Sequence, residues 1–209
     1  MLTAFTAGLL LITVSELGDK TFFIAMILAM HHSRRWVFTG VVAALAAMTI
    51  ISVLFGKAVS RLPEVYTHYA VIVLFIFFGI KLLYQASKIT AAADKAEVME
   101  EMEEAKAAVE KADLQLPKRK TPLSIVSEAF VLTFMAEWGD RTQIATIALA
   151  AGKNAIGVTI GAILGHAICA AIAVIGGKMI AGKISERQLT FAGGCLFLIF
   201  GVVAAIEGV

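Results

Sequence analysis

The sequence has few of the residues that shape the surface and loops of a soluble protein. Charged residues make up only 16% of its 209 positions, and there are three prolines and two cysteines. Cys169 and Cys195 both lie inside apolar runs, where a small core residue is expected and a disulfide is not. The net charge of +2 provides no large basic surface, so nucleic acid is not an expected partner.

Apolar residues are correspondingly abundant. They make up 59% of the chain, and the mean hydropathy is +0.86, which is too high for a soluble domain. A membrane helix needs about 20 apolar residues to cross about 30 Å of hydrocarbon. The runs of this kind lie at about 2–30, 37–59, 67–86, 124–151, 155–177 and 189–206. The sequence therefore predicts an all-α integral membrane protein with six transmembrane helices. The first run has no basic segment or cleavage site before it, so we expect it to be a helix of the mature protein.

The two halves of the chain repeat each other. Shifting the sequence by 121 positions places Glu16 on Glu137 and Asp19 on Asp140. The glycines that repeat in the same way are Gly18 with Gly139, Gly40 with Gly161, Gly56 with Gly177 and, at a shift of 122, Gly79 with Gly201. Each half holds three of the predicted spans, so we expect a duplicated three-helix unit.

A charged segment joins the two halves. It is rich in Glu, Ala and Lys, has almost no turn residues before Pro117, and ends in the basic residues 118–120. We expect it to be a partly helical, solvated tether. The chain is thus divided into a first three-helix repeat at 1–87, a linker at 88–121 and a second repeat at 122–209.

An odd number of spans per half makes the second half enter the membrane inverted relative to the first. Many secondary transporters are built from such inverted repeats and bind their substrate near the midplane, between the repeats. Twelve Lys and Arg residues lie on the linker side of the predicted spans and three on the other side. The positive-inside rule therefore predicts a cytoplasmic linker, with both termini on the opposite side of the membrane.

Charge reappears inside two of the predicted spans. SELGDKT at 15–21 and AEWGDRT at 136–142 each lie near the middle of a long apolar run. Gly18 and Gly139 weaken a helix locally, so we expect the first and fourth spans to be long or broken helices.

Each motif carries a Glu and an Asp three positions apart, on one helix face. A charge at the centre of a bilayer costs a few kcal/mol or more unless it faces partners or water. The four central carboxylates belong to Glu16, Asp19, Glu137 and Asp140. Together they predict a functional site at the membrane midplane.

Oxygen ligands dominate this predicted site. Carboxylates, with the hydroxyls of Thr21 and Thr142, suit hard divalent cations such as Ca²⁺, Mn²⁺ or Mg²⁺, and no thiolate cage is present for zinc or copper. Four carboxylates with Lys20 and Arg141 sum to a charge of −2, which one divalent cation or two protons would neutralise. We therefore predict that a divalent cation and protons exchange at the same carboxylates, with no permanently bound cofactor.

Other nearby residues are secondary candidates. They are Ser15, Lys20, Arg141, Gln143, Glu128 and His166. The Glu and the basic residue of each motif also have the i,i+4 spacing of an intrahelical salt bridge, which would be a purely structural role. His166 lies mid-span, where the other repeat has Leu45, and either carries protons or bonds a neighbouring helix. Glu128 either lines an access path or lies near the membrane interface.

The two motifs, ELGDKT and EWGDRT, both fit the pattern E-x-G-D-[KR]-[TS]. This duplicated pattern resembles the Gdt-one family of manganese or calcium/proton antiporters, and the resemblance covers essentially the whole chain. It implies that the four central carboxylates bind the transported cation, with Thr21 and Thr142 close by. It also implies that Mn²⁺, or else Ca²⁺, leaves the cytoplasm in exchange for protons. The opening of the sequence is similar to cyanobacterial members, which implies a bacterial inner membrane or a thylakoid-type internal membrane.

Other functions fit parts of the pattern. A cation channel also uses a ring of acids, and an exporter of small organic solutes would place an apolar pocket beside them, with Phe22 and Trp138 as candidates. An intramembrane aspartyl protease carries a G-x-G-D motif, but its partner motif is missing here and the two Glu residues would have no role in it. The pattern therefore favours a transporter that works by alternating access, and not an enzyme. Its expected partners are the cation, protons and the lipid bilayer, and the pattern leaves the oligomeric state open.

Overall fold

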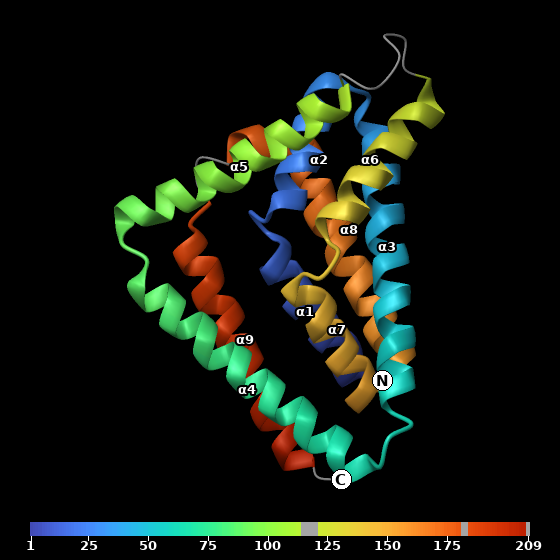
Figure 1. Ribbon diagram of the computed structural model, residues 1–209, viewed down its shortest axis with the longest axis vertical. Helices are drawn as coiled ribbons and strands as arrows, with labels where there is room; N and C mark the ends of the chain where they lie inside the picture. Colours follow the sequence, from blue (N-terminus) through green and yellow to red (C-terminus); the bar gives the residue numbers. More distant parts are fainter. Residues whose placement is uncertain (114–120, 181–183, 208–209) are drawn as a thin grey trace.

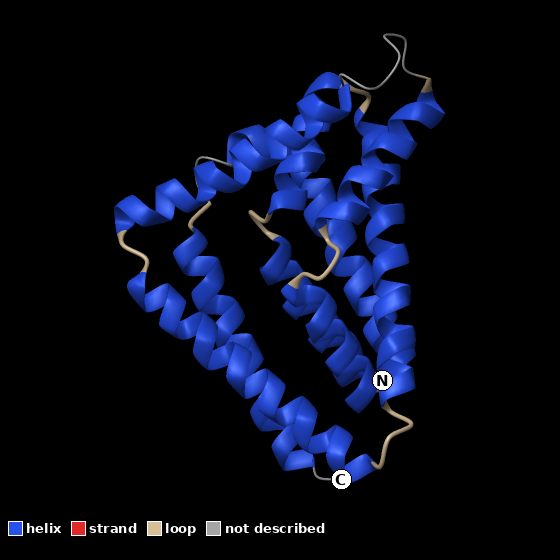
Figure 2. Cartoon of the chain, viewed as in Figure 1, coloured by secondary structure: helices blue, strands red, loops and turns tan. Residues whose placement is uncertain are grey.

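The computed structural model describes residues 1–113, 121–180 and 184–207, all of them in helices or short connections (Figures 1 and 2). In chain order the helices are α1 Leu2–Glu16, α2 Lys20–His31, α3 Arg34–Val59, α4 Glu64–Lys88, α5 Ala91–Asp113, α6 Pro122–Ala136, α7 Arg141–Gly152, α8 Ala155–Ile180 and α9 Glu186–Glu207. The predicted helix end at Pro117 and the basic residues 118–120 lie outside the described residues.

Four of the helices are long and apolar enough to cross a membrane. They are α3, α4, α8 and α9, while α1, α2 and α6 are shorter apolar helices. The all-α prediction is confirmed for the described residues, and the apolar helices are those of a membrane protein.

Each of the two longest predicted spans is broken at its motif. The run predicted at 2–30 is α1 followed by α2, and the run at 124–151 is α6 followed by α7. Gly18 has a φ of 82° and Gly139 a φ of 86°, a left-handed conformation that costs other residues free energy. The two breaks lie in the middle of the molecule, where Figure 2 shows them as short loops between helices. The glycines of the repeated motif therefore end one half-helix and let the next begin.

The two halves pack in matching ways. α1 lies against α8 as α6 lies against α3, and α2 contacts α8 as α7 contacts α3. A Cβ on Gly40 would collide with the carbonyl oxygen of Val126, and a Cβ on Gly161 with that of Phe5. These are the same contact in the two halves, because each pair of residues is related by the 121-residue shift. α4 and α9 form a second matched pair and lie side by side along one edge of the molecule (Figure 1).

The linker helix α5 is not a fully solvated tether. It crosses one end of the molecule and packs mainly against α2 (Figure 1). Ala105 and Val109 are fully buried in a core cluster, and Val98 and Met102 pack against the same cluster. These four apolar positions recur every three or four residues, so one face of α5 is docked while its acidic face stays in solvent. The expectation of a solvated tether is therefore wrong for one side of this helix.

Candidate cation site

The helix breaks give the two motif aspartates different tasks. Asp140 is the N-cap of α7, and its Oδ2 accepts hydrogen bonds from the backbone N–H of Thr142 at 3.0 Å and from its hydroxyl at 2.9 Å. Asp19 is the N-cap of α2, but its side chain makes no capping hydrogen bond. The Asp19 carboxylate is therefore available to other groups in the centre of the molecule.

Three carboxylates come together between the breaks. One oxygen each from Glu16, Asp19 and Glu137 lies within 4.8 Å of the others. Glu16 and Glu137 are each only 2% exposed. The hydroxyl of Thr21 donates a hydrogen bond to Glu16 Oε2 at 3.3 Å. Three of the four predicted carboxylates thus form one oxygen-rich cluster drawn from both halves of the chain, and the capping role of Asp140 keeps it outside this group.

Several buried polar atoms at this cluster lack a hydrogen-bond partner. Among the described residues, the unpartnered buried side-chain atoms are Glu16 Oε1, Glu137 Oε1, His166 Nδ1 and Thr133 Oγ1. Native proteins rarely leave such atoms unpaired, because burying an unpaired polar group is costly. The two Glu oxygens therefore mark a place where a positively charged species would be strongly stabilised.

A small polar cavity adjoins the cluster on the side of α3. It measures about 10 Å³, enough for roughly one water molecule. Glu137 and His166 line it together with the hydroxyl residues Thr49, Ser52 and Thr146. Gln143 lines it as well, and its amide Nε2 donates one hydrogen bond to Met48 Sδ. On this side the cluster is almost closed.

The sequence pointed to Thr142, which also lines this cavity, but not to Thr49 and Ser52 of α3 or Thr146 of α7. Thr49 and Ser52 stand three positions apart in an otherwise apolar helix, on one face. That spacing was the sequence feature that could have predicted their role at the cavity. It is a weak feature, because Ser and Thr side chains in helices often donate hydrogen bonds to the backbone of their own helix. Both of them do so here, to the carbonyl oxygens of Leu45 and Met48.

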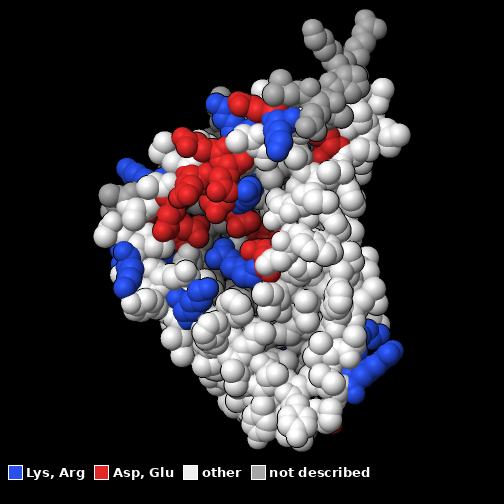
Figure 3. Space-filling model, in the orientation of Figure 1, with Lys and Arg blue, Asp and Glu red and all other residues white. Residues whose placement is uncertain are grey.

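A wider polar pocket lies on the other side, beneath α5. It measures about 370 Å³ and is lined by Arg141, Glu97, Glu186 and Lys88, among others. Figure 3 shows acidic side chains gathered over α5, with basic side chains just below them. Arg141 directly follows Asp140 in the second motif, so this pocket lies beside the helix break that contributes Glu137 to the cluster.

The basic residues of the motifs do not form the intrahelical salt bridges that their i,i+4 spacing left open as an alternative. Lys20 Nζ pairs with Glu104 Oε2 of α5 at 2.6 Å. The Arg141 guanidinium donates a long hydrogen bond of 3.5 Å to the backbone carbonyl of Ser15. An i,i+4 pair needs a continuous helix, and each helix ends between the Glu and the basic residue. The structural reading of these pairs is therefore wrong.

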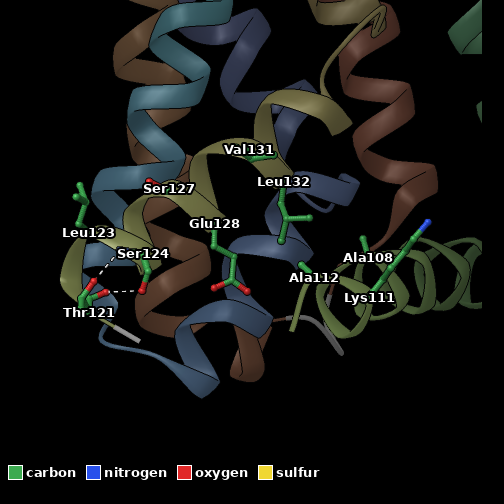
Figure 4. Close-up of a pocket in the computed structure, with 10 residues that line it drawn as sticks. All are labelled: Ala108, Lys111, Ala112, Thr121, Leu123, Ser124, Ser127, Glu128, Val131 and Leu132. Atoms are coloured by element: carbon green, nitrogen blue, oxygen red, sulfur yellow. Dashed lines mark hydrogen bonds between the residues drawn. The ribbon is translucent and has the colours of Figure 1, made fainter. Parts of the chain in front are cut away.

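Glu128 lies apart from the cluster. About 12 Å of α6 separate it from the motif at 1.5 Å per residue. It is buried, with Oε2 3.8 Å from Nε2 of His32. It also lines a pocket of about 690 Å³ between α6 and α5, where Figure 4 shows its carboxylate across from Ala112 and Lys111. Glu128 thus lies at the α5 end of the helices, not in the central cluster.

Comparison with known proteins agrees with the duplicated motif. The model of the family described as "Divalent cation/proton antiporter GDT1" matches residues 4–90 and 125–209, the two segments on either side of the linker. The chain belongs to the GDT1 family. The resemblance inferred from the motifs is thereby confirmed, and GDT1 proteins are cation transporters, not enzymes.

Relatives match nearly the full length of this GDT1 chain. It is 61% identical to GDT1-like protein sll0615 of Synechocystis over 204 residues, covering 98% of this chain and 97% of the relative. It is 48% identical to GDT1-like protein 3 of Oryza sativa subsp. indica, a match that covers 95% of this chain and 72% of the relative. A chloroplastic PAM71 homologue of Arabidopsis thaliana is 41% identical, and that match covers 95% of this chain and 58% of the relative. No solved structure matches the chain.

Proposed function

We propose that this GDT1 chain exchanges Mn²⁺, with Ca²⁺ as a second possible substrate, for protons and moves the cation out of the cytoplasm. The observation that carries the proposal is the cluster of two buried glutamates, Glu16 and Glu137, with the half-buried Asp19, whose ligand oxygens lie within 4.8 Å of one another at two helix breaks. Clustered carboxylate oxygens are the ligands that hard divalent cations prefer. Membership of a family of divalent cation/proton antiporters supports the same substrate class.

The charge of the cluster requires that cation and protons replace each other. Lys20 pairs with Glu104 and not with the site, so the four central carboxylates and Arg141 sum to −3 when all are ionised. A bare charge of that size is unstable in a buried, poorly solvated place. A divalent cation neutralises most of it in one state, and protons on the same carboxylates do so in the other. Exchange at shared groups therefore couples the two fluxes.

The site opens unequally toward its two sides, as alternating access requires. The pocket beneath α5 holds about 370 Å³, whereas the cavity beside Thr49 and Ser52 holds about 10 Å³. We assign the wide side to the cytoplasm, together with the linker, because most Lys and Arg residues lie there. Both termini then lie on the opposite side, of a bacterial inner membrane or a thylakoid-type membrane.

The broken helices support a six-span, inverted arrangement. We propose that α1 with α2, and α6 with α7, each form one broken span, and that α3, α4, α8 and α9 supply the other four. The matched packing of α1 on α8 and α6 on α3 supports two inverted repeats at 1–87 and 122–209, joined by the linker at 88–121. In such repeats the half-helix ends lie at the substrate site.

Transport into proteoliposomes tests the function. Vesicles with a pH gradient would be loaded with Mn²⁺, Ca²⁺ or Mg²⁺ while cation and proton fluxes are recorded. Glu16→Gln and Glu137→Gln should each abolish cation flux, whereas Glu64→Gln, an exposed acid at the start of α4, should not. Asp140→Asn should reduce transport less than Asp19→Asn, because Asn also caps a helix. Cation flux with no proton counterflux, or full activity in Glu16→Gln, would disprove the proposal.

A further inference from the structure

We propose that His166 is a direct nitrogen ligand of the transported cation. It would make the site favour a first-row transition-metal dication such as Mn²⁺ over Ca²⁺ and Mg²⁺. This inference rests on the proposed cation site and adds to it a ligand that lies outside both repeated motifs.

The position of His166 points to the cation site. It lies in the middle of α8 and is 6% exposed. Its Nδ1 is 3.9 Å from Glu16 Oε1, too far for a hydrogen bond, and both atoms are buried with no hydrogen-bond partner in the part of the chain that the structure describes. His166 also lines the same small cavity as Glu137, whose Oε1 is unpartnered too. The unpaired atoms of His166 and Glu16 therefore face each other, and Glu137 of the carboxylate cluster lines the same cavity as His166.

The distance between His166 and Glu16 suits a shared ion better than a direct contact. A metal–nitrogen bond measures about 2.1 Å, so two ligand atoms of one ion can be up to about 4.2 Å apart. The observed 3.9 Å between Nδ1 and Oε1 falls within that reach. An ion placed between these atoms would supply the partner that each of them lacks.

Packing alone does not account for a histidine at this position. The 121-residue shift pairs His166 with Leu45, which occupies the corresponding place on α3 and lines the same cavity. An apolar side chain therefore serves the matching position of the other repeat. A buried histidine with a merely structural role is expected to bond a neighbouring helix, but its Nδ1 has no partner among the described residues.

A nitrogen ligand and a narrow cavity both act on selectivity. Ca²⁺ takes six to eight oxygen ligands, and Mg²⁺ binds oxygen and gives up its water reluctantly. Imidazole nitrogen suits transition metals, and affinity at nitrogen-containing sites rises from Mn²⁺ toward the later metals. The cavity of about 10 Å³ beside His166 leaves little room for the extra waters that a large Ca²⁺ shell would bring. Both features favour Mn²⁺ over Ca²⁺ at a carboxylate cluster whose oxygen ligands alone would accept either of these two ions.

Electron spin echo spectroscopy of bound Mn²⁺ tests the ligand directly. Full-length protein in detergent, loaded with Mn²⁺ alone, should show nitrogen coupling from one coordinated imidazole. The coupling should vanish in His166→Asn and His166→Gln while Mn²⁺ remains bound. It should persist in His31→Asn, an exposed histidine at the end of α2. Absence of nitrogen coupling in the wild-type protein, or its persistence in both His166 variants, would overturn the inference without recourse to transport.

Transport selectivity provides the second measurement. Loss of an outer-shell partner of a metal ligand already costs about 10- to 100-fold in metal affinity. We therefore expect His166→Gln to raise the KM for Mn²⁺ at least tenfold while the KM for Ca²⁺ changes much less. An unchanged ratio of the two KM values, in a protein that still exchanges cations for protons, would refute the role of His166 and leave the proposed function standing. If the wild-type protein transported no cation at all, the proposed function itself would be refuted instead.

Discussion

Replacing each motif glycine by alanine separates backbone strain from crowding. Gly18 and Gly139 occupy the same place in the two motifs and have nearly the same positive φ, 82° and 86°. Their surroundings differ. A Cβ on Gly18 would lie 2.7 Å from Cγ2 of Ile184, whereas a Cβ on Gly139 would meet nothing within 4 Å. Both alanine substitutions thus incur backbone strain, and only the one at Gly18 also crowds a neighbouring side chain.

The magnitudes follow from this difference. A left-handed backbone costs an L-residue about 1–2 kcal/mol, which both Gly18→Ala and Gly139→Ala incur. Crowding against packed side chains typically adds about 1–3 kcal/mol, and only Gly18→Ala incurs it. We therefore expect Gly139→Ala to destabilise the protein mildly and Gly18→Ala by roughly twice as much or more. Asn tolerates the left-handed conformation better than Ala, so Gly139→Asn should recover part of the loss.

Thermal unfolding in detergent and transport in proteoliposomes measure these effects. The unfolding midpoints should fall in the order wild type, Gly139→Asn, Gly139→Ala and Gly18→Ala. Transport should decline in the same order, because the breaks position the carboxylates. Equal losses for the two alanine variants, or a larger loss for Gly139→Ala, would refute the reasoning from local geometry.

Two further predictions concern helix packing and the linker. Gly161→Ala should lower the free energy of unfolding by about 1–3 kcal/mol, because its Cβ would collide with the backbone of Phe5. Gly193→Ala should have little effect, because the nearest atom to its Cβ would be 3.8 Å away. Thermal unfolding midpoints of the two variants compare these effects. Burial, with Glu104 and Glu186 nearby, raises the pKa of Glu101 above its ordinary 4.5, so docking of α5 should be favoured at low pH and weaken as pH rises through that raised pKa. Protease accessibility of α5 across this pH range checks this. Glu101→Gln should reduce the pH dependence, and what is left should come from Glu97 of the same helix, whose pKa is also raised by burial and by Glu186. An unchanged dependence in Glu101→Gln would contradict the assignment.

Much of the fold was visible in local features of the sequence. A carboxylate inside a long apolar run stands out because burying it is costly, and its recurrence 121 residues later marks the duplication. The helix breaks at Gly18 and Gly139 were predictable for a similar reason, since a glycine beside polar groups weakens a helix whatever surrounds it. The family, the all-α class and the candidate carboxylates were all determined by such local chemistry.

Contacts between distant segments were decided only by the tertiary structure. Lys20 finds its partner in Glu104, 84 residues away on a helix that was expected to be a solvated tether. Asp140 turns to its own helix end, so it does not join the three clustered carboxylates, although its place in the motif is the same as that of Asp19. His166 of α8 lies 3.9 Å from Glu16 of α1, so the two side chains come from different halves of the chain. Sequence periodicity states which face of a helix a residue occupies, but the neighbour that the face meets depends on how all the helices pack together.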